Sequence, residues 1–308
     1  MSTILYTHPA CLEHTNGPMH PERPERLAAI LAALQADEFK ALERREAPKA
    51  SLDQIAAMHP RDHVDLILAS VPESGFVQLD GDTSMCPASG EAALRAAGGV
   101  CAAVDAVFAG EADNAFCAVR PPGHHAEASH AMGFCIFNSV AVAAAHARNA
   151  HGLKRVAVMD FDVHHGNGTQ HMFEADGDLF YASTHQMPLY PGTGSVQERG
   201  VGNICNAPLP PMAGGDHFRD TMTDIILPGL RAFGPELLIV SAGFDAHMAD
   251  PLAQLNLEAD DYAWATRALL AVAADCCEGR LVSSLEGGYD LDALAASASA
   301  HVRELMAA

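Results

Sequence analysis

The feature that most constrains the fold is an alternation of short apolar runs with longer, alanine-rich segments. Several runs are apolar throughout, as strands buried on both faces must be. We therefore predict an α/β fold with a mostly parallel sheet covered by helices. No repeat or Ser/Gly linker divides the 308 residues, so a single domain over 1–308 is expected. The predicted strands are 3–6, 115–119, 156–159, 179–182, 237–240 and 281–284, and the predicted helices are 24–36, 90–108, 139–149, 218–232, 260–276 and 290–306.

Unusual polar sequences follow the predicted strands, each at the point where a strand ends. In chain order they read RPPGHH, DFDVHHGNG, STH, SAGFDAH and EGGYD. Ligands of open parallel sheets bind outside the carboxyl ends of the strands. The sequence therefore predicts one functional site at that edge of the sheet.

Two of these sequences contain residues that suit a metal. Asp160, Asp162 and His164 occupy alternate positions leaving a strand, so they share one side while the chain is extended. Two carboxylates and an imidazole suit a borderline divalent ion such as zinc, and ferrous iron is also compatible. Asp245 is the natural third ligand, from the end of another strand. Three protein ligands leave a position open for water and substrate, as a catalytic site requires.

Acid–base and oxyanion groups are predicted beside the metal. His124 and His125 follow a Pro-Pro-Gly turn that would hold them in a fixed orientation. An imidazole there can take a proton from the attacking water and return it to a departing amine. Asp160 and Asn167 are available to orient the histidines. Tyr289, after two glycines, can donate to a developing oxyanion. These groups together predict a metal-dependent hydrolase.

Composition restricts the partners. Asp and Glu number 39 against 18 Lys and Arg, a formal net charge of −21 that would repel nucleic acid and anionic membranes. The longest apolar stretch, 134–145, is too short to cross a bilayer, and the N-terminus lacks a signal-peptide pattern. Eight cysteines without paired spacing indicate free thiols, and hence a cytoplasmic protein. A homo-oligomer is compatible with the sequence.

Taken together, the motifs resemble the histone deacetylase and acetylpolyamine amidohydrolase family, nearer to its class II branch. This resemblance implies a three-layer arginase/deacetylase-like fold and zinc-dependent removal of acetyl or other acyl groups from the side-chain amine of lysine. The motifs that carry it are HPERPERL (20–27), RPPGHHA (120–126), MGFCIFNSVAVAA (132–144), DFDVHHGNGTQ (160–170), STHQMPLYPGTG (183–194), SAGFDAHMADP (241–251) and EGGYD (286–290).

The resemblance also assigns roles by position. Asp162, His164 and Asp245 match the zinc ligands. His125 matches the main general base and acid, and Tyr289 the residue that polarises the scissile carbonyl. The remaining matches are Asp160 as the support of His124, Asn167 beside His125, Phe134 and Tyr190 as channel walls with Gly133 in the same channel, and a potassium site formed by carbonyls around Asp160, Asp162 and His164 and by Ser183 and Thr184.

Two further positions bear on the substrate. Leu252 matches a gatekeeper at the channel mouth that is Glu in polyamine-selective relatives. Without that attraction for a distal cation, acyl-lysine in a peptide or protein is favoured over an acetylpolyamine. Asp82 matches a rim carboxylate that grips substrate amides, and a solvated loop residue is an equal interpretation. A small N-acyl amine stays an open alternative.

Two other functions are disfavoured. A binuclear manganese ureohydrolase needs further carboxylates at positions that are Gly166 and Gly243 here. A non-catalytic acyl-lysine binder would show damage to the ligands, tandem histidines or tyrosine, all of which are present. The remaining histidines are expected on the surface or in the core rather than as ligands, including His59, His63, His146 and His301.

Overall fold

An eight-stranded sheet forms the centre of the computed structural model, which describes residues 2–308. The strand order is β2-β1-β5-β10-β9-β6-β7-β8, and every neighbouring pair is parallel. This confirms the prediction of an α/β fold with a parallel sheet. The strands are β1 Thr3–Thr7, β2 Glu43–Glu46, β5 Asn114–Cys117, β6 Val156–Asp160, β7 Leu179–Gln186, β8 Ile204–Leu209, β9 Leu237–Ala242 and β10 Leu281–Leu285, with β3 Val77–Asp80 and β4 Thr83–Met85 in a separate antiparallel pair.

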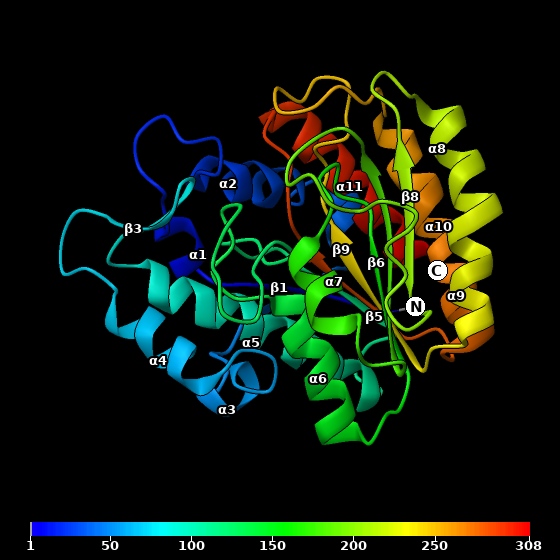
Figure 1. Cartoon of the computed structure of the whole chain (residues 1–308). Coiled ribbons are helices and arrows are strands. Elements are labelled where there is room, and N and C mark those ends of the chain that lie inside the picture. Colours follow the sequence, from blue (N-terminus) through cyan, green and yellow to red (C-terminus); the bar gives the residue numbers. More distant parts are fainter. Residues whose placement is uncertain (1) are drawn as a thin grey trace.

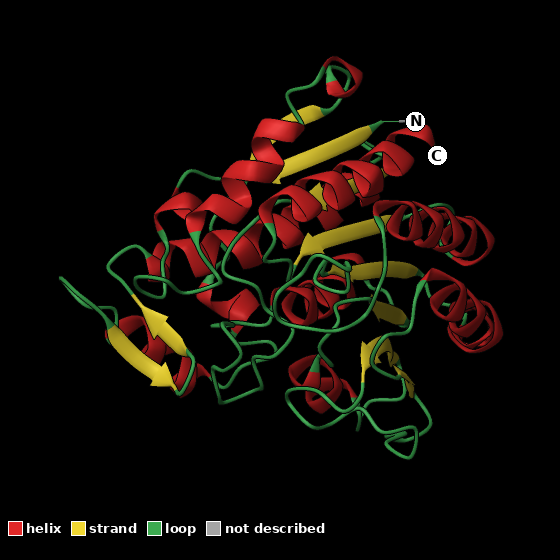
Figure 2. Ribbon diagram, turned by 90° about the horizontal axis from the view of Figure 1, so that it is seen from above, coloured by secondary structure: helices red, strands yellow, loops and turns green. Residues whose placement is uncertain are grey.

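Helices cover both faces of this sheet, in three layers (Figure 1 and Figure 2). The chain moves outward from β5 through β6 and β7 to β8, then returns through β9 and β10. Because crossovers between parallel strands are right-handed, the outward and return connections lie on opposite faces. The helical segments are α1 Ala10–Glu13, α2 Pro24–Ala33, η1 Asp37–Phe39, α3 Leu52–Ile55, α4 Arg61–Ala69, α5 Ser89–Phe108, α6 Ser139–His151, α7 Asn167–Phe173, α8 Gly215–Thr221, η2 Met222–Ile226, α9 Leu227–Phe233, α10 Ala259–Cys276 and α11 Leu291–Ala307.

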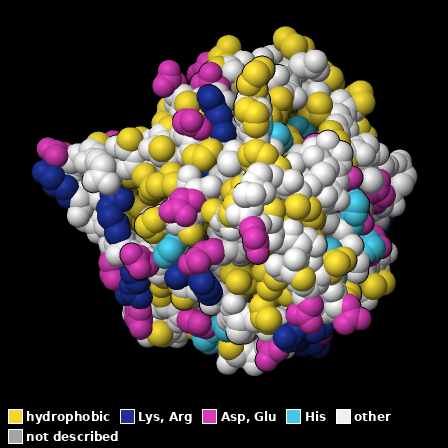
Figure 3. Space-filling view, turned by 90° about the vertical axis from the view of Figure 1, so that its left-hand side faces the viewer, with side chains coloured by type: hydrophobic (Ala, Val, Ile, Leu, Met, Phe, Trp, Pro, Cys, Tyr) yellow, Lys and Arg dark blue, Asp and Glu magenta, His cyan; other side chains and the backbone are white. Residues whose placement is uncertain are grey.

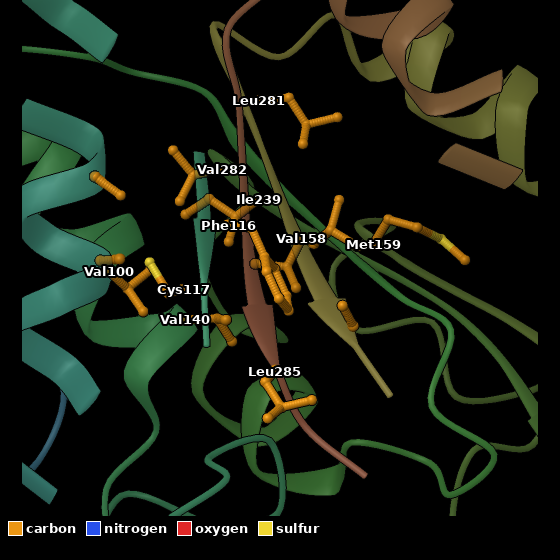
Figure 4. Close-up of a cluster of buried hydrophobic side chains, with 14 of the residues drawn as sticks. Val100, Phe116, Cys117, Val140, Val158, Met159, Ile239, Leu281, Val282 and Leu285 are labelled. Atoms are coloured by element: carbon orange, nitrogen blue, oxygen red, sulfur yellow. The ribbon is translucent and has the colours of Figure 1, made fainter. Parts of the chain in front are cut away.

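The middle of the sheet forms the core. Every residue of β5, β6, β9 and β10 is buried. Figure 4 shows side chains of these strands, among them Val158, Ile239 and Val282, together with Val100 of α5 and Val140 of α6. Small residues let the helices approach closely. A Cβ at Gly98 would lie under 3.0 Å from the backbone of residues 48–50, so a larger residue would displace α5.

Several local predictions are confirmed and two need correction. Asn138 caps α6 by accepting from the amide of Ala141 at 3.0 Å, and Gly152 ends the same helix in a left-handed conformation. The predicted helix 218–232 instead starts at Gly215 and contains a π-helical turn, η2, before Pro228, which has no N–H to donate. Strands β2 and β8 were not predicted, because the all-polar β2 and the partly exposed β8 lie at the sheet edges.

The surface mixes charges of both signs. Figure 3 shows acidic and basic side chains interspersed with apolar ones on one face of the molecule. Arg61 of α4, for example, pairs with Asp53 and Asp65. Over residues 2–308, no helix has both the length and the apolar character needed to cross a membrane. All eight cysteines are free, as predicted.

Candidate active site

The chain turns sharply where β6 ends. Asp160 is the last residue of β6, and its Oδ1 accepts from the amide of Asp162 at 3.1 Å. Oδ1 of Asp162 in turn accepts from the amide of His164 at 2.9 Å. These two bonds fold the segment into successive turns, so the chain is not extended beyond Asp160 and the alternation expected of an extended chain does not apply there. The turns direct Asp160 toward His124 and leave Asp162 beside His164.

Asp162, His164 and Asp245 converge in the interior. One potential ligand atom from each lies within 4.8 Å of the others, and all three residues are buried. Nδ1 of His164 is 3.0 Å from Oδ2 of Asp245 and 3.2 Å from Oδ1 of Asp162. Backbone amides anchor both carboxylates, Val163 N to Asp245 at 2.8 Å and Gly287 N to Asp162 at 2.8 Å. The structure therefore places the three predicted ligands in a geometry that could hold a metal.

The charges of this cluster also fit a cation. Burial would raise the pKa of Asp162, but the neighbouring His124 and His164 lower it well below its usual range. Burial and the charge of Asp162 raise the pKa of Asp245 to about 7. Two buried carboxylates held this closely require positive charge nearby. A divalent ion bound by both would supply it.

At three glycines, the carboxylates of the site occupy the space that a side chain would need. A Cβ at Gly243 would lie under 3.0 Å from the carboxylate of Asp162, and one at Gly287 would meet the carboxylates of both Asp162 and Asp245. A Cβ at Gly166 would meet the carboxylate of Asp160. No additional carboxylate can therefore enter at Gly166 or Gly243, which argues against a binuclear centre.

The tandem histidines are held by different partners. Nδ1 of His124 is 2.9 Å from Oδ2 of Asp160, and Nδ1 of His125 is 2.8 Å from Oδ1 of Asn167. The Asn167 amide nitrogen donates to Glu127 at 2.9 Å, so its oxygen accepts the Nδ1–H of His125. In neutral His125, Nε2 then carries a lone pair, and this residue lines the central cavity. His125 is thus placed to accept a proton.

The two imidazoles also differ electrostatically. Burial alone would lower the pKa of His124, but Asp162 and Asp160 raise it well above its usual value. The pKa of His125 is lowered well below its usual value by burial and by the positive charges of His124 and His164. One imidazole therefore favours the charged form and its neighbour the neutral form.

Sequence reasoning missed a carboxylate behind the histidines. Oε2 of Glu286 accepts from the amides of Gly123 and His124 at 2.6 and 3.1 Å, and Ser241 Oγ donates to Oε1 at 3.3 Å. Glu286 thereby ties the histidine loop to β9 and β10. The available signal was its position directly after a buried strand, as the first residue of EGGYD.

Arg26 fixes the segment that carries Tyr289. This buried guanidinium donates to the carbonyls of Glu286 and Gly288 and lies 4.7 Å from the centre of the Tyr289 ring. It is also paired with buried Glu22 at 3.0 Å. Through Arg26, the HPERPERL segment therefore fixes the backbone on which Tyr289 is carried.

A narrow channel leads from the surface to the cluster. Its volume is about 180 Å³. The rings of Phe134 and Tyr289 pack edge to face with their centres 5.9 Å apart, and the rings of Tyr190 and His125 do so with their centres 5.1 Å apart. Gly133 has a positive φ of 58° and lies so close to His125 that a Cβ would clash with its ring. The lining residues are Asp82, His125, Gly133, Phe134, His164, Leu189, Tyr190, Leu252 and Tyr289, of which only Leu189 was not predicted.

Asp82 has a structural partner at the channel wall. Its Oδ1 accepts from the amide of Gly133 at 3.0 Å, and its carbonyl accepts from His20 at 3.2 Å. Thr83 Oγ1 accepts from the next amide, that of Phe134, at 2.9 Å. The β3–β4 turn therefore supports the channel wall, and neither original interpretation of Asp82 included this contact.

The residues expected at a potassium site are adjacent. Ser183 pairs with Asp160 in the β6–β7 register, and Thr184 follows it. Thr184 Oγ1 is buried and, among residues 2–308, has no hydrogen-bond partner. Such an oxygen fits a cation ligand.

Comparisons with known proteins agree with this geometry. The family model described as "Histone deacetylase domain" matches residues 20–305. The chain belongs to the histone deacetylase family. It is 38% identical to "Histone deacetylase 14, chloroplastic" of Arabidopsis thaliana, covering 98% of this chain and 76% of the relative. It is 39% identical to a "Histone deacetylase-like amidohydrolase" of Pseudomonas aeruginosa (93% and 81%) and to a "Probable deacetylase" of Archaeoglobus fulgidus (95% and 82%).

A solved structure shows the same fold. The "Crystal Structure of HDA15 HD domain" superimposes with a TM-score of 0.93 at 35% identity, covering 99% of this chain and 88% of that one. The predicted arginase/deacetylase fold is confirmed. This member of the histone deacetylase family is therefore a hydrolase that acts on amides.

Proposed function

We propose that the protein is a zinc-dependent deacylase, acting as one domain, that removes acetyl or related acyl groups from the side-chain amine of lysine in peptides or proteins. One observation carries this proposal: a channel of about 180 Å³ is lined by His125, His164 and Tyr289. Pockets for drug-sized ligands are about 300–1,000 Å³, so this channel suits a single slender chain. Acyl-lysine has that shape, with its amide at the end.

The protein residues divide the reaction between them. A divalent ion held by Asp162, His164 and Asp245 would supply Lewis-acid polarisation of the acyl carbonyl and acidify water. His125, oriented by Asn167, accepts the proton of the attacking water at Nε2 and later returns it to the departing amine. The Tyr289 hydroxyl donates to the oxyanion, and closure of the channel around the substrate chain excludes bulk water.

The finer identities of the ions belong to the same proposal. Two carboxylates and one imidazole suit zinc, and ferrous iron is the alternative ion. The Thr184 hydroxyl, which is buried and has no hydrogen-bond partner among the described residues, is the observation that favours a potassium ion near Ser183. Such an ion would stabilise the turn that follows β6. Metal content of the protein, isolated without added metal and measured by elemental analysis, separates zinc from iron.

The substrate class rests on the apolar channel mouth. Leu189 and Leu252 line the same cavity as Tyr190, so this wall offers no charge to a distal amine, and the carboxylate of Asp82 in the same lining already accepts from the amide of Gly133. Acyl-lysine in a chain is therefore favoured over an acetylpolyamine, and a small N-acyl amine is the second candidate. Leu252→Glu should raise the preference for acetylpolyamine, measured as the ratio of kcat/KM values. An unchanged ratio would remove Leu252 as a selectivity determinant.

A substrate panel tests the main proposal. Zinc-loaded protein is assayed with acyl-lysine peptides, acetylpolyamines and small N-acyl amines, and acetyl-lysine peptide is expected to give the highest kcat/KM. Tyr289→Phe should lower kcat about 10²–10³-fold, the usual effect of losing one oxyanion donor, with unchanged metal content. Asp245→Ala should instead lose stoichiometric metal. Full activity in Tyr289→Phe, or full metal occupancy in Asp245→Ala, would contradict the assigned roles.

A further inference from the structure

A second group of potential metal ligands lies on the outer surface of the α5–α6 pair. Nε2 of His146 and Nε2 of His151 are each 2.7 Å from the same atom, Oδ1 of Asp105. One potential ligand atom from each residue lies within 4.8 Å of the others. We propose that Asp105, His146 and His151 form a surface site for a zinc-like divalent ion, separate from the catalytic cluster. The proposal departs from our expectation that His146 is a surface or core residue and not a ligand.

The position of the group makes it independent of the catalytic site. Asp105 lies in the last turn of α5, and His151 is the last residue of α6. Both helices end shortly before a strand begins, α5 before β5 and α6 before β6. The group therefore lies at the amino-terminal edge of the sheet, whereas the catalytic residues follow the carboxyl ends of the strands. Figure 1 shows α5 and α6 as neighbours on one face.

The electrostatic setting favours a cation. Two helix C-termini meet here, and each carries a partial negative charge from its unpaired carbonyls. Asp105 adds a full charge. Burial would raise the pKa of Asp105, but its hydrogen bonds to His146 and His151 lower it, so the carboxylate is ionised at neutral pH. Two imidazoles and a carboxylate are a familiar set of three protein ligands, which leaves a position for water.

Neighbouring side chains already hold the rings in place. Phe108 stacks on His151, with ring centres 4.7 Å apart and planes inclined by 24°. The side-chain nitrogen of Gln54 lies 3.2 Å from Nδ1 of His146 and orients this ring by donating to it while Nδ1 carries no proton. The His146 and His151 side chains are 12% and 23% exposed, whereas Asp105 is 51% exposed and free to adjust. Ligand atoms of a tetrahedral zinc site lie roughly 3.3 Å apart for bonds of about 2.0–2.1 Å. Each Asp105–histidine distance of 2.7 Å would therefore lengthen by about 0.6 Å on binding.

Gln54 supplies a specific consequence. Its Oε1 accepts from the amide of Ser51 at 2.8 Å in the capping box of α3, which turns its nitrogen toward His146. A metal bound at Nε2 leaves the His146 proton on Nδ1, where an acceptor is needed. In Gln54→Glu, one carboxylate oxygen can keep the cap while the other accepts this proton. That variant should bind the ion about 10-fold more tightly.

The test is the number of zinc ions bound by the full-length protein. Chelator-stripped protein is equilibrated with Zn²⁺ by dialysis and analysed by elemental analysis. His146→Gln/His151→Gln should hold one ion fewer than the unsubstituted protein, whereas the surface control His171→Gln/His217→Gln should hold the same number. Retained amide hydrolysis and an unchanged circular dichroism spectrum verify that both double variants are folded.

Two results would overturn the proposal. One is equal zinc content in the unsubstituted protein and in His146→Gln/His151→Gln, since Asp105 would then only accept two hydrogen bonds. The other is an unchanged dissociation constant in Gln54→Glu. The two proposals can fail independently. The surface proposal is tested by the difference of one ion between the two proteins, whereas the catalytic proposal is tested by whether His146→Gln/His151→Gln still binds one zinc ion.

Discussion

Glu286 offers the sharpest test of how the histidine loop is held. In Glu286→Ala the buried amides of Gly123 and His124 lose their acceptor. An orphaned buried donor costs about 1–3 kcal/mol, so two cost about 2–6 kcal/mol. Glu286→Gln is the matched control. Its single oxygen has two lone pairs for the two amides, and its nitrogen can donate to Ser241. Burial raises the pKa of Glu286 to about 7, so a neutral amide is a modest change.

Thermal unfolding and steady-state kinetics measure both consequences. At about 2.1 cal/mol/K of unfolding entropy per residue, 1 kcal/mol corresponds to roughly 1.5 °C for 308 residues, so Glu286→Ala should lower Tm by at least about 3 °C. Glu286→Gln should stay within about 2 °C of the unsubstituted protein. Displacement of the loop by about 1 Å should lower kcat of Glu286→Ala about 10²-fold. Equal Tm values for the two variants would refute the argument that these hydrogen bonds hold the loop.

Two further predictions concern other parts of the molecule. Gly243→Ala should lose bound metal and activity, because the added methyl group would displace the Asp162 carboxylate. The control Gly177→Ala places its methyl group 3.8 Å from Val201 and should keep both metal and activity. Metal content is measured by elemental analysis, and full metal content in Gly243→Ala would contradict the steric argument. Burial lowers the pKa of His301 to about 3, so the folded state keeps this imidazole neutral while the unfolded chain binds a proton below about pH 6.5. The contribution of neutral His301 to the free energy of unfolding is therefore present above pH 6.5 and declines as the pH falls toward 3. Between pH 6.5 and 5, the free energy of unfolding measured in urea should fall by about 2 kcal/mol more in the unsubstituted protein than in His301→Gln. Parallel pH profiles for the two proteins would exclude that role.

Much of the active site was predictable because its residues lie close to strand ends. A buried parallel strand is recognisable from a continuous apolar run, and parallel strands bring their carboxyl ends to one edge. That logic located His124, Asp162, Asp245 and Tyr289 without any knowledge of their contacts. It did not give the conformation after β6, since the turns around Asp162 depend on side-chain bonds to nearby amides.

Other features depended on packing between distant segments. Glu286 acquires its role only when β10 places it beneath Gly123, 163 residues away in the chain. Asp105 and His146 are 41 residues apart, on helices whose individual patterns indicate only which side faces the sheet. The amino-acid sequence by itself determined which strands are followed by catalytic residues and of what types these residues are. It also determined that no further carboxylate stands at Gly166 or Gly243. The tertiary structure alone decided which atoms meet, because the register of one element against another depends on side-chain volume across the whole interface and not on any local period.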